Sequence, residues 1–196
     1  MSVDISVAQW IRAKGFPSGL NKLFQLSEVF GHGLGTAAIL LTIWVLAPQL
    51  RVRLPRVIGA AFLPGIGANV VKLCLARQRP YSIHRLTDIR VFDTFQGWFP
   101  FLSKGTAWQS FPSSHTAVAV GLALGLSWLF PRGKWLFAGF AVLAAVQRLT
   151  SAHHFPSDVL WGAAVGWMCG AACLPGGWLS PTFDRLEAGL IARAAR

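Results

Sequence analysis

The sequence predicts an all-α fold, a polytopic membrane helix bundle of about five transmembrane helices preceded by an N-terminal interfacial segment. Hydrophobic residues make up 54% of the 196 residues and charged residues only 13%, against roughly 25% charged residues in a soluble domain. The apolar residues gather in five runs separated by polar connections. The length suits one domain. We therefore expect a single membrane-embedded domain over residues 1–196, with a motif-bearing core at about 57–174.

The first 31 residues mix apolar, basic and small residues and are too interrupted to span a bilayer. They favour an amphipathic segment on the membrane surface, or alternatively a simple lead-in to the first span. That span covers Gly33 to Ala47, extended backwards by two apolar residues, and is long enough to cross when tilted. The second runs from about Val57 to Leu75 and contains Pro64, which membrane helices tolerate.

A long connection, polar at first and then aromatic, leads from Tyr81 to Phe111. The third span begins after His115 and ends near residue 130, and a tight turn at 131–134 leads into the fourth, from 135 to about 149. The fifth runs from Asp158, a plausible N-cap, to about residue 174. The tail ends in a basic amphipathic piece from 183 to 196.

The charge pattern predicts the orientation. The short loops at 48–56 and 131–134 carry five basic residues and no acid, so we expect them to be cytoplasmic. The connections at 76–113 and 148–158 then face outwards, towards the periplasm of a bacterial inner membrane. The net charge of +11 is spread between apolar runs without a nucleic-acid-binding motif, so we expect no nucleic-acid partner.

The three cysteines all lie in apolar runs, which is typical of buried thiols. Cys169 and Cys173 have helical i, i+4 spacing, but no nearby His or further Cys completes a set of metal ligands. The sequence also contains no Gly-rich phosphate loop and no Asp/Glu metal cluster. We therefore expect no metal and no cofactor.

The expected topology places three polar clusters on the outward side. Three cations that local acids cannot neutralise require an anion, and phosphate suits them because Arg binds its oxygens bidentately and Lys supplies a point charge. A helix that starts just after Pro112 would also direct its free N–H groups at this anion. The clusters are Lys72 with Arg79, Ser113 with His115, and Arg148 with His154 and Asp158.

Two histidines and a carboxylate could complete a reaction at this phosphate. A neutral imidazole can attack phosphorus when a hydrogen bond holds its other nitrogen, and Asp158 follows His154 by four residues. A second imidazole, for which His115 is the candidate, could protonate the leaving group and then activate water.

These residues resemble a known family. The patterns Lys72-x6-Arg79-Pro80, Pro112-Ser113-Ser114-His115 and Arg148-x5-His154-x3-Asp158 resemble the three signatures of the type 2 phosphatidic acid phosphatase (PAP2) family. Its superfamily also includes bacterial acid phosphatases and vanadium haloperoxidases. Each pattern alone is weakly specific, but all three in order, each beside an expected span, are strongly specific.

The resemblance implies a role for each residue. His154 would be the nucleophile, Asp158 its orienting carboxylate, and His115 the general acid and then base. The phosphate would be bound by the remaining residues of the three patterns, namely Lys72, Arg79, Ser113, Ser114 and Arg148. The sequence departs from the family pattern at Ser114, where Gly is usual, and at Gln147, where Ser is usual. Of the other polar residues, His153 is expected to pack beside the site or tune it. Arg77 could assist phosphate binding, but a lone extra cation more often contacts lipid headgroups.

The function expected from the resemblance is metal-independent hydrolysis of a lipid phosphate monoester or diphosphate through a phosphohistidine. The partners would be membrane lipids and a lipid phosphate substrate of the undecaprenyl diphosphate, phosphatidic acid, phosphatidylglycerol phosphate or lipid A phosphate class. Two alternatives stay open. One is a vanadium-dependent haloperoxidase using the same residues, and the other is a catalytically silent lipid-phosphate binder or transporter.

Overall fold

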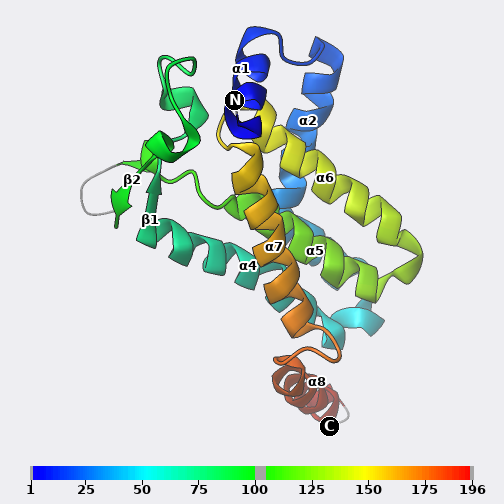
Figure 1. Cartoon of the computed structure of the whole chain (residues 1–196). Helices are drawn as coiled ribbons and strands as arrows, with labels where there is room; N and C mark the ends of the chain where they lie inside the picture. Colours follow the sequence, from blue (N-terminus) through cyan, green and yellow to red (C-terminus); the bar gives the residue numbers. More distant parts are fainter. Residues whose placement is uncertain (1, 100–104, 195–196) are drawn as a thin grey trace.

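The computed structural model describes residues 2–99 and 105–194 and is dominated by helices (Figure 1). The long connection between α4 and α5 contributes the short strands β1 (Leu75–Arg77) and β2 (Phe95–Trp98), which pair antiparallel. The helices are α1 (Val3–Ala13), α2 (Ser18–Gly31), α3 (Gly33–Leu46), α4 (Leu54–Cys74), α5 (Ser114–Leu129), α6 (Lys134–Thr150), α7 (Pro156–Cys173) and α8 (Ser180–Ala194). The expected all-α class is therefore correct for the bundle, but it did not include this pair of strands.

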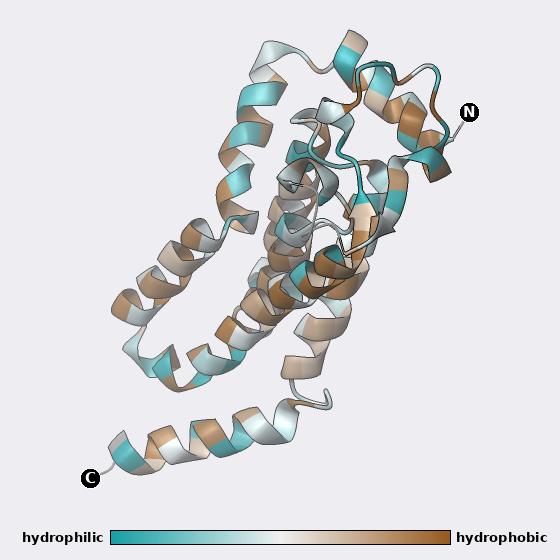
Figure 2. Ribbon diagram, turned by 90° about the vertical axis from the view of Figure 1, so that its left-hand side faces the viewer, coloured by the Kyte–Doolittle hydropathy of each residue, from teal (hydrophilic) through white to brown (hydrophobic). Residues whose placement is uncertain are grey.

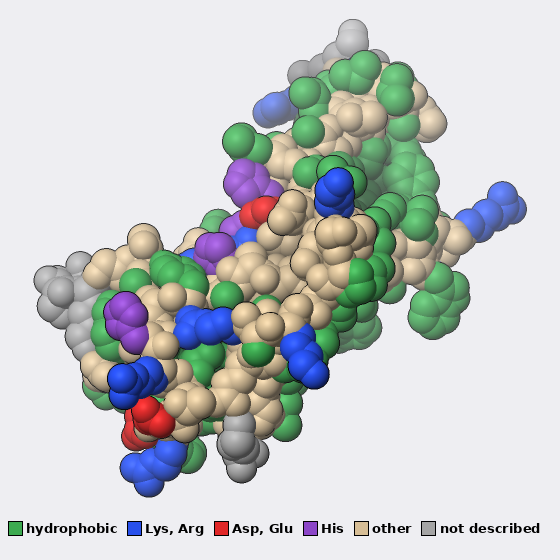
Figure 3. All heavy atoms as spheres, turned by 90° about the horizontal axis from the view of Figure 1, so that it is seen from above, with side chains coloured by type: hydrophobic (Ala, Val, Ile, Leu, Met, Phe, Trp, Pro, Cys, Tyr) green, Lys and Arg blue, Asp and Glu red, His purple; other side chains and the backbone are tan. Residues whose placement is uncertain are grey.

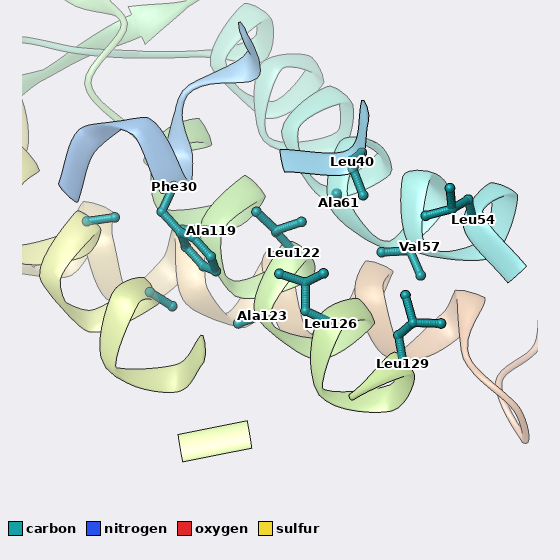
Figure 4. Close-up of a cluster of buried hydrophobic side chains, with 12 residues drawn as sticks. Phe30, Leu40, Leu54, Val57, Ala61, Ala119, Leu122, Ala123, Leu126 and Leu129 are labelled. Carbon is teal, nitrogen blue, oxygen red and sulfur yellow. The ribbon is translucent and has the colours of Figure 1, made fainter. Parts of the chain in front are cut away.

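Helix α5 forms the centre of the bundle, and α4, α6 and α7 all pack against it. Small residues allow this close packing. A Cβ added at Gly121 would lie 2.1 Å from the carbonyl oxygen of Ala60 on α4, and one at Gly166 of α7 would lie 2.7 Å from that of Ala117. Larger apolar side chains from α4 and α5, including Val57 and Leu122, fill the remaining core (Figure 4).

Two of the five expected spans have counterparts by helix length and hydropathy. A 3-10 helix at Pro48–Arg53 continues directly into α4, and together they are long and apolar enough to cross a membrane. Helices α2 and α3 together also reach this length and hydropathy, but the pair is bent by 68°. Helix α5 has 16 residues and α6 has 17, fewer than the roughly 20 that a bilayer core requires. The remaining three spans stay predictions.

The N-terminal residues are more closely integrated than an interfacial segment would be. They form α1 and α2, and α2 packs along α6 and α5 (Figure 1). Ile5 and Ala8 of α1 are buried in a cluster with Phe155. A Cβ at Gly31, the last residue of α2, would lie 2.7 Å from the carbonyl oxygen of His115. Tertiary packing therefore places this segment directly against the start of α5.

The opposite end of the bundle is closed by α8, which extends sideways from it (Figure 2). Arg56 of α4 is 1% exposed and holds this helix. Its guanidinium donates to Asp184 at 2.5 Å, Glu187 at 2.8 Å and Ser180 at 3.0 Å. The expected basic amphipathic tail is thus a helix. Its acids pair with Arg56, which is far away in sequence, and these ion pairs anchor it to the bundle.

Candidate active site

The candidate site lies at the end of the bundle where α4 ends, α5 begins, α6 ends and α7 begins. Lys72 is in the last turn of α4, His115 in the first turn of α5, Arg148 in the last turn of α6 and Asp158 in the first turn of α7. Figure 3 looks onto this end and shows histidine, basic and acidic side chains gathered there. The fold therefore brings the three predicted clusters to one end of the molecule.

His154 is buried beside Asp158. Its Nδ1 lies 3.7 Å from Oδ2 of Asp158, longer than a hydrogen bond, and it has no hydrogen-bond partner among the described residues. Catalytic hydrogen bonds are often long in free enzymes and shorten with substrate. Burial lowers the pKa of His154 to about 4, against the opposing effect of the Asp158 carboxylate. The imidazole is therefore neutral at neutral pH, and its Nε2 is the nitrogen left for chemistry.

Asp158 is held in place from several sides. Its Oδ2 accepts hydrogen bonds from the Ser110 hydroxyl at 2.6 Å and from the backbone N–H of Phe155 at 2.8 Å. Its Oδ1 is paired with the guanidinium of Arg77. The side chain is completely buried, so these donors fix the carboxylate that faces His154.

Arg77 is the main residue that the sequence analysis misplaced. It is 0% exposed rather than in contact with lipid headgroups. Besides Asp158, it donates to Asp4 of α1 at 2.6 Å and to the Ser157 hydroxyl at 2.7 Å, and its guanidinium lies over the ring of Phe155. No sequence pattern links positions 4, 77 and 158, because only the packing of α1 against α7 brings them together.

The three predicted phosphate-binding cations have unequal surroundings. Lys72 is buried, and its Nζ donates to the Ser114 hydroxyl at 2.7 Å. Among the described residues, the guanidinium of Arg79 donates one long hydrogen bond, at 3.3 Å, to the carbonyl of Gln109. Burial lowers the pKa of Arg79. The Nε atoms of Arg79 and Arg148 are buried and have no hydrogen-bond partner within the described residues. Buried donors of this kind favour an anionic ligand.

The start of α5 has the geometry expected for anion binding, with one change. Ser113 is the N-cap, and its hydroxyl accepts from the Thr116 backbone N–H at 3.3 Å and the Thr116 hydroxyl at 2.9 Å. Its oxygen thus already serves the helix, and phosphate binding by Ser113 stays a prediction. The first N–H groups of a helix have no partner within it, so those of Ser114 and His115 are candidates for binding an anion.

A second missed residue is Glu28 of α2. Its carboxylate accepts from Arg148 Nη1 at 2.8 Å and from Gln147 Nε2 at 3.2 Å. The same Oε1 lies 3.9 Å from Nε2 of His115. Gln147, which departs from the family pattern, is buried and thus helps to hold this acid. The sequence signal was an isolated acid in a mixed segment, and it indicated no partner.

Two further histidines lie beside the site: His153, which packs against Tyr81, and His32, whose ring centroid is 5.7 Å from that of His115. The ring of His153 contacts Tyr81 edge to face, with centroids 5.4 Å apart, and burial lowers its pKa. No group of three or more His, Cys, Asp or Glu side chains among the described residues is arranged to hold a metal ion. The three cysteines are free thiols.

Comparisons with known proteins agree with this arrangement. Residues 53–180 match the model of the PAP2 superfamily. The lipid A 1-phosphatase of Rhizobium johnstonii is 33% identical over 102 residues, which cover 52% of this chain and 38% of that protein. The undecaprenyl-diphosphatase BcrC of Bacillus subtilis is 28% identical over 137 residues, covering 68% of this chain and 63% of the relative. The matched part thus spans about two fifths of the Rhizobium relative's length.

A solved structure supports the fold. The crystal structure of Aquifex aeolicus LpxE superposes with a TM-score of 0.63, covers 88% of this chain and 95% of that one, and is 22% identical in sequence. The match to the family model covers most of the chain and includes all three predicted clusters. The chain therefore belongs to the PAP2 superfamily.

Proposed function

We propose that the protein hydrolyses a lipid phosphate, monoester or diphosphate, by a metal-independent mechanism. The observation that carries the proposal is the buried imidazole of His154 beside the fixed carboxylate of Asp158. This pair lies at the end of the bundle where α4 and α6 end, and the last turns of those helices carry Lys72 and Arg148. The relatives named as lipid A 1-phosphatase and undecaprenyl-diphosphatase support the same reaction class.

The proposed reaction has two steps. His154 Nε2 attacks phosphorus, the bond from phosphorus to the lipid oxygen breaks, and His115 donates a proton to that leaving oxygen. In the second step His115 takes a proton from water, the hydroxide attacks phosphorus, and the phosphorus–nitrogen bond breaks to release inorganic phosphate. Asp158 orients the imidazole and stabilises its positive charge.

The cations would stabilise the negative charge that develops on the phosphate oxygens. Lys72, Arg79 and Arg148 supply positive charge, and the N-terminus of α5 adds backbone donors. Donors already in place need no reorganisation as the charge develops. This cationic set supports a reaction in which protein groups supply the charge that a metal ion supplies in other phosphoryl-transfer enzymes.

An apolar groove supports a lipid as the substrate. It has a volume of about 630 Å³ and lies between α5, α6 and α7. Its end near the site is lined by Thr116, Leu149 and Val159, which directly follow His115, Arg148 and Asp158 in sequence. Trp135 and Trp167 line it further along. A lipid tail lying in this groove would place its phosphate beside the catalytic residues.

We further propose that residues 1–196 form one multi-pass domain in a bacterial inner membrane, with the site facing outwards. Large apolar side chains on α6 and α7 are exposed, including Trp135, Val142, Leu160 and Trp167, and Figure 2 shows hydrophobic residues along the bundle helices. The basic loops at the opposite end favour a cytoplasmic position for that end.

The experiment compares phosphate release by the purified full chain and its His154→Ala variant. The substrates are undecaprenyl diphosphate, phosphatidic acid, phosphatidylglycerol phosphate and lipid A in detergent, with a chelator present. His154→Ala should abolish turnover and the acid-labile phosphoenzyme trapped with radiolabelled substrate. The exposed His84 provides a matched control, because His84→Ala should retain both. Unchanged turnover in His154→Ala would refute the mechanism, and loss of activity with chelator would refute metal independence.

Vanadate separates the haloperoxidase alternative in the same experiment. Vanadate should inhibit phosphate release, because it occupies the site of the transferred phosphoryl group. If vanadate instead supported peroxidase activity with halide, the phosphatase proposal would be wrong.

A further inference from the structure

The candidate site has openings on two sides of α6, and the two openings differ in chemistry. Val146 and Leu149 of α6 line the apolar groove shared with α5 and α7. Gln147 and Arg148, which lie between them in sequence, line a second pocket of about 380 Å³ that faces α2. The lining of this polar pocket consists of Asn21, Gln25, Glu28, Gln147, Arg148, Thr150, Ser151 and His153. All of these side chains are polar, so the C-terminal end of α6 separates an apolar opening from a polar one.

The wall on α2 follows from the spacing of its polar residues. Asn21, Gln25 and Glu28 follow an i, i+4, i+7 pattern, which places them on one face of the helix. This helix packs along α6 (Figure 1). The amides on this wall and the hydroxyl groups of Thr150 and Ser151 opposite can both donate and accept hydrogen bonds. The polar pocket can therefore hold water and a hydrated anion.

The two openings match the needs of the proposed reaction. Hydrolysis consumes water and produces a lipid alcohol and inorganic phosphate. The hydrocarbon part of the lipid favours the apolar groove, whereas an ion moved into apolar surroundings without partners loses much free energy of hydration. Water and phosphate thus require a polar route, and the polar pocket supplies one beside Arg148.

Arg148 belongs both to the lining of the polar pocket and to the proposed phosphate-binding cations. Its Nη1 donates to Oε1 of Glu28 at 2.8 Å and to Oε1 of Gln147 at 3.1 Å. Its Nε is buried and has no hydrogen-bond partner among the described residues. One guanidinium thus carries a donor committed to the pocket wall and a donor that is free for an anion.

Glu28 is placed to compete with the product for this guanidinium. Its side chain is 39% exposed, and its Oε2 accepts from Gln147 Nε2 at 3.2 Å. Two anions beside one cation repel each other, so phosphate bound to Arg148 weakens the ion pair with Glu28. By reciprocity, the ion pair weakens the binding of phosphate by the same factor.

We infer that the polar pocket is the route by which water enters and inorganic phosphate leaves, and that Glu28 displaces the product phosphate from Arg148. This inference rests on the proposed function and assigns a path to its second step. The lipid alcohol leaves by the apolar groove, so the lipid and aqueous paths lie on opposite sides of α6.

The test measures how long phosphate stays in the site. Retained phosphate can react again with His154, which re-forms the phosphorus–nitrogen bond and releases water, and the next hydrolysis introduces another oxygen from the solvent. In water labelled with ¹⁸O, the wild-type chain in detergent should release phosphate with a single labelled oxygen from the lipid phosphate that it hydrolyses fastest. Gln25→Trp narrows the pocket from an exposed position, and Glu28→Gln removes the competing charge. Both variants should release phosphate with several labelled oxygens.

Rates and a control variant distinguish a blocked route from a damaged site. In Gln25→Trp, the lipid alcohol should form at the wild-type rate in a single turnover, while steady-state phosphate release falls about ten-fold because release becomes rate-limiting. The exposed neighbour Lys22 lies outside the pocket lining, so Lys22→Trp should match the wild type in labelling and rate. A single labelled oxygen with Gln25→Trp would refute the route, and the same result with Glu28→Gln would refute the displacement.

Exchange of inorganic phosphate with the His154→Ala protein, measured by ³¹P NMR, separates this inference from the proposed function. If no lipid phosphate is hydrolysed by the wild type, the proposed function fails. In that case, slower phosphate exchange when Gln25→Trp is added still supports the route, and exchange equal to that of His154→Ala alone refutes it.

Discussion

Arg77→Met provides a direct test of how the site is held together. Methionine has a similar length and apolar stem but removes the guanidinium. In the folded protein this guanidinium pairs with Asp158 and donates to Asp4 at 2.6 Å, and those two side chains are 0% and 8% exposed. The variant therefore leaves two carboxylates buried without their shared cation.

The expected loss of stability follows from this burial. Removing one partner of a buried ion pair costs about 3–5 kcal/mol, and we expect the upper part of this range because one guanidinium serves two acids. For a chain of this size, about 3–5 kcal/mol lowers the Tm by about 6–20 °C. Arg77→Lys keeps the charge but cannot bridge both carboxylates in the same way. Its Tm should therefore lie between those of the wild type and Arg77→Met.

The assay combines thermal unfolding in detergent with steady-state kinetics. We expect kcat of Arg77→Met to fall while KM changes little, because Asp158 then orients His154 poorly and the phosphate-binding cations remain. Arg90 is a matched control on the same connection. It is 88% exposed and pairs with Asp93 on the surface, so Arg90→Met should leave both Tm and kcat unchanged.

A double-mutant cycle decides whether the loss comes from the ion pair. Combining Arg77→Met with Asp4→Asn removes one of the two uncompensated acids, so the double variant should be more stable than the sum of the single losses by about 0.5–3 kcal/mol. Additive losses, or an Arg77→Met variant with wild-type Tm, would refute this electrostatic explanation.

Two further predictions concern pH and product binding. Because protonated imidazole cannot attack phosphorus and burial lowers the pKa of His154 to about 4, kcat/KM for an aryl phosphate, whose leaving group needs no proton from His115, should fall only as the pH drops through about 4; an acid limb near pH 6.5, the ordinary histidine value, would contradict this. Glu28→Gln should lower the inhibition constants of phosphate and vanadate several-fold, since the carboxylate at 2.8 Å competes with these anions for Arg148, and unchanged or higher inhibition constants would show that Glu28 does not compete.

The sequence could predict the parts of the site that local patterns encode. Lys72, His115, Arg148 and Asp158 each lie at the end of an apolar run, and helices of the bundle bring those ends together. The four-residue spacing of His154 and Asp158 predicts that their side chains lie near each other. Each of these relations joins residues close in sequence or at matching ends of helices.

The parts that could not be predicted depend on contacts between distant segments. Arg77 pairs with an acid 73 residues away and Arg148 with one 120 residues away, and no periodicity relates such positions. Strands β1 and β2 have three and four residues, too few to give a clear alternating pattern. The position of Ser113 in its motif fits both phosphate binding and helix capping, and sequence alone does not separate the two. In the structure its hydroxyl oxygen caps α5.

The N-terminal helices complete the electrostatics of the site from both sides. Asp4 of α1 balances Arg77 behind the proposed nucleophile, and Glu28 of α2 balances Arg148 beside the proposed general acid. Both acids precede residue 53, where the match to the PAP2 superfamily begins. The residues that we propose to bind and attack the phosphate all lie within the matched segment. Because Glu28 Oε1 lies 3.9 Å from Nε2 of His115, we expect substitutions in the N-terminal segment, which lies outside the family match, to change the rate of the step that needs the proposed general acid.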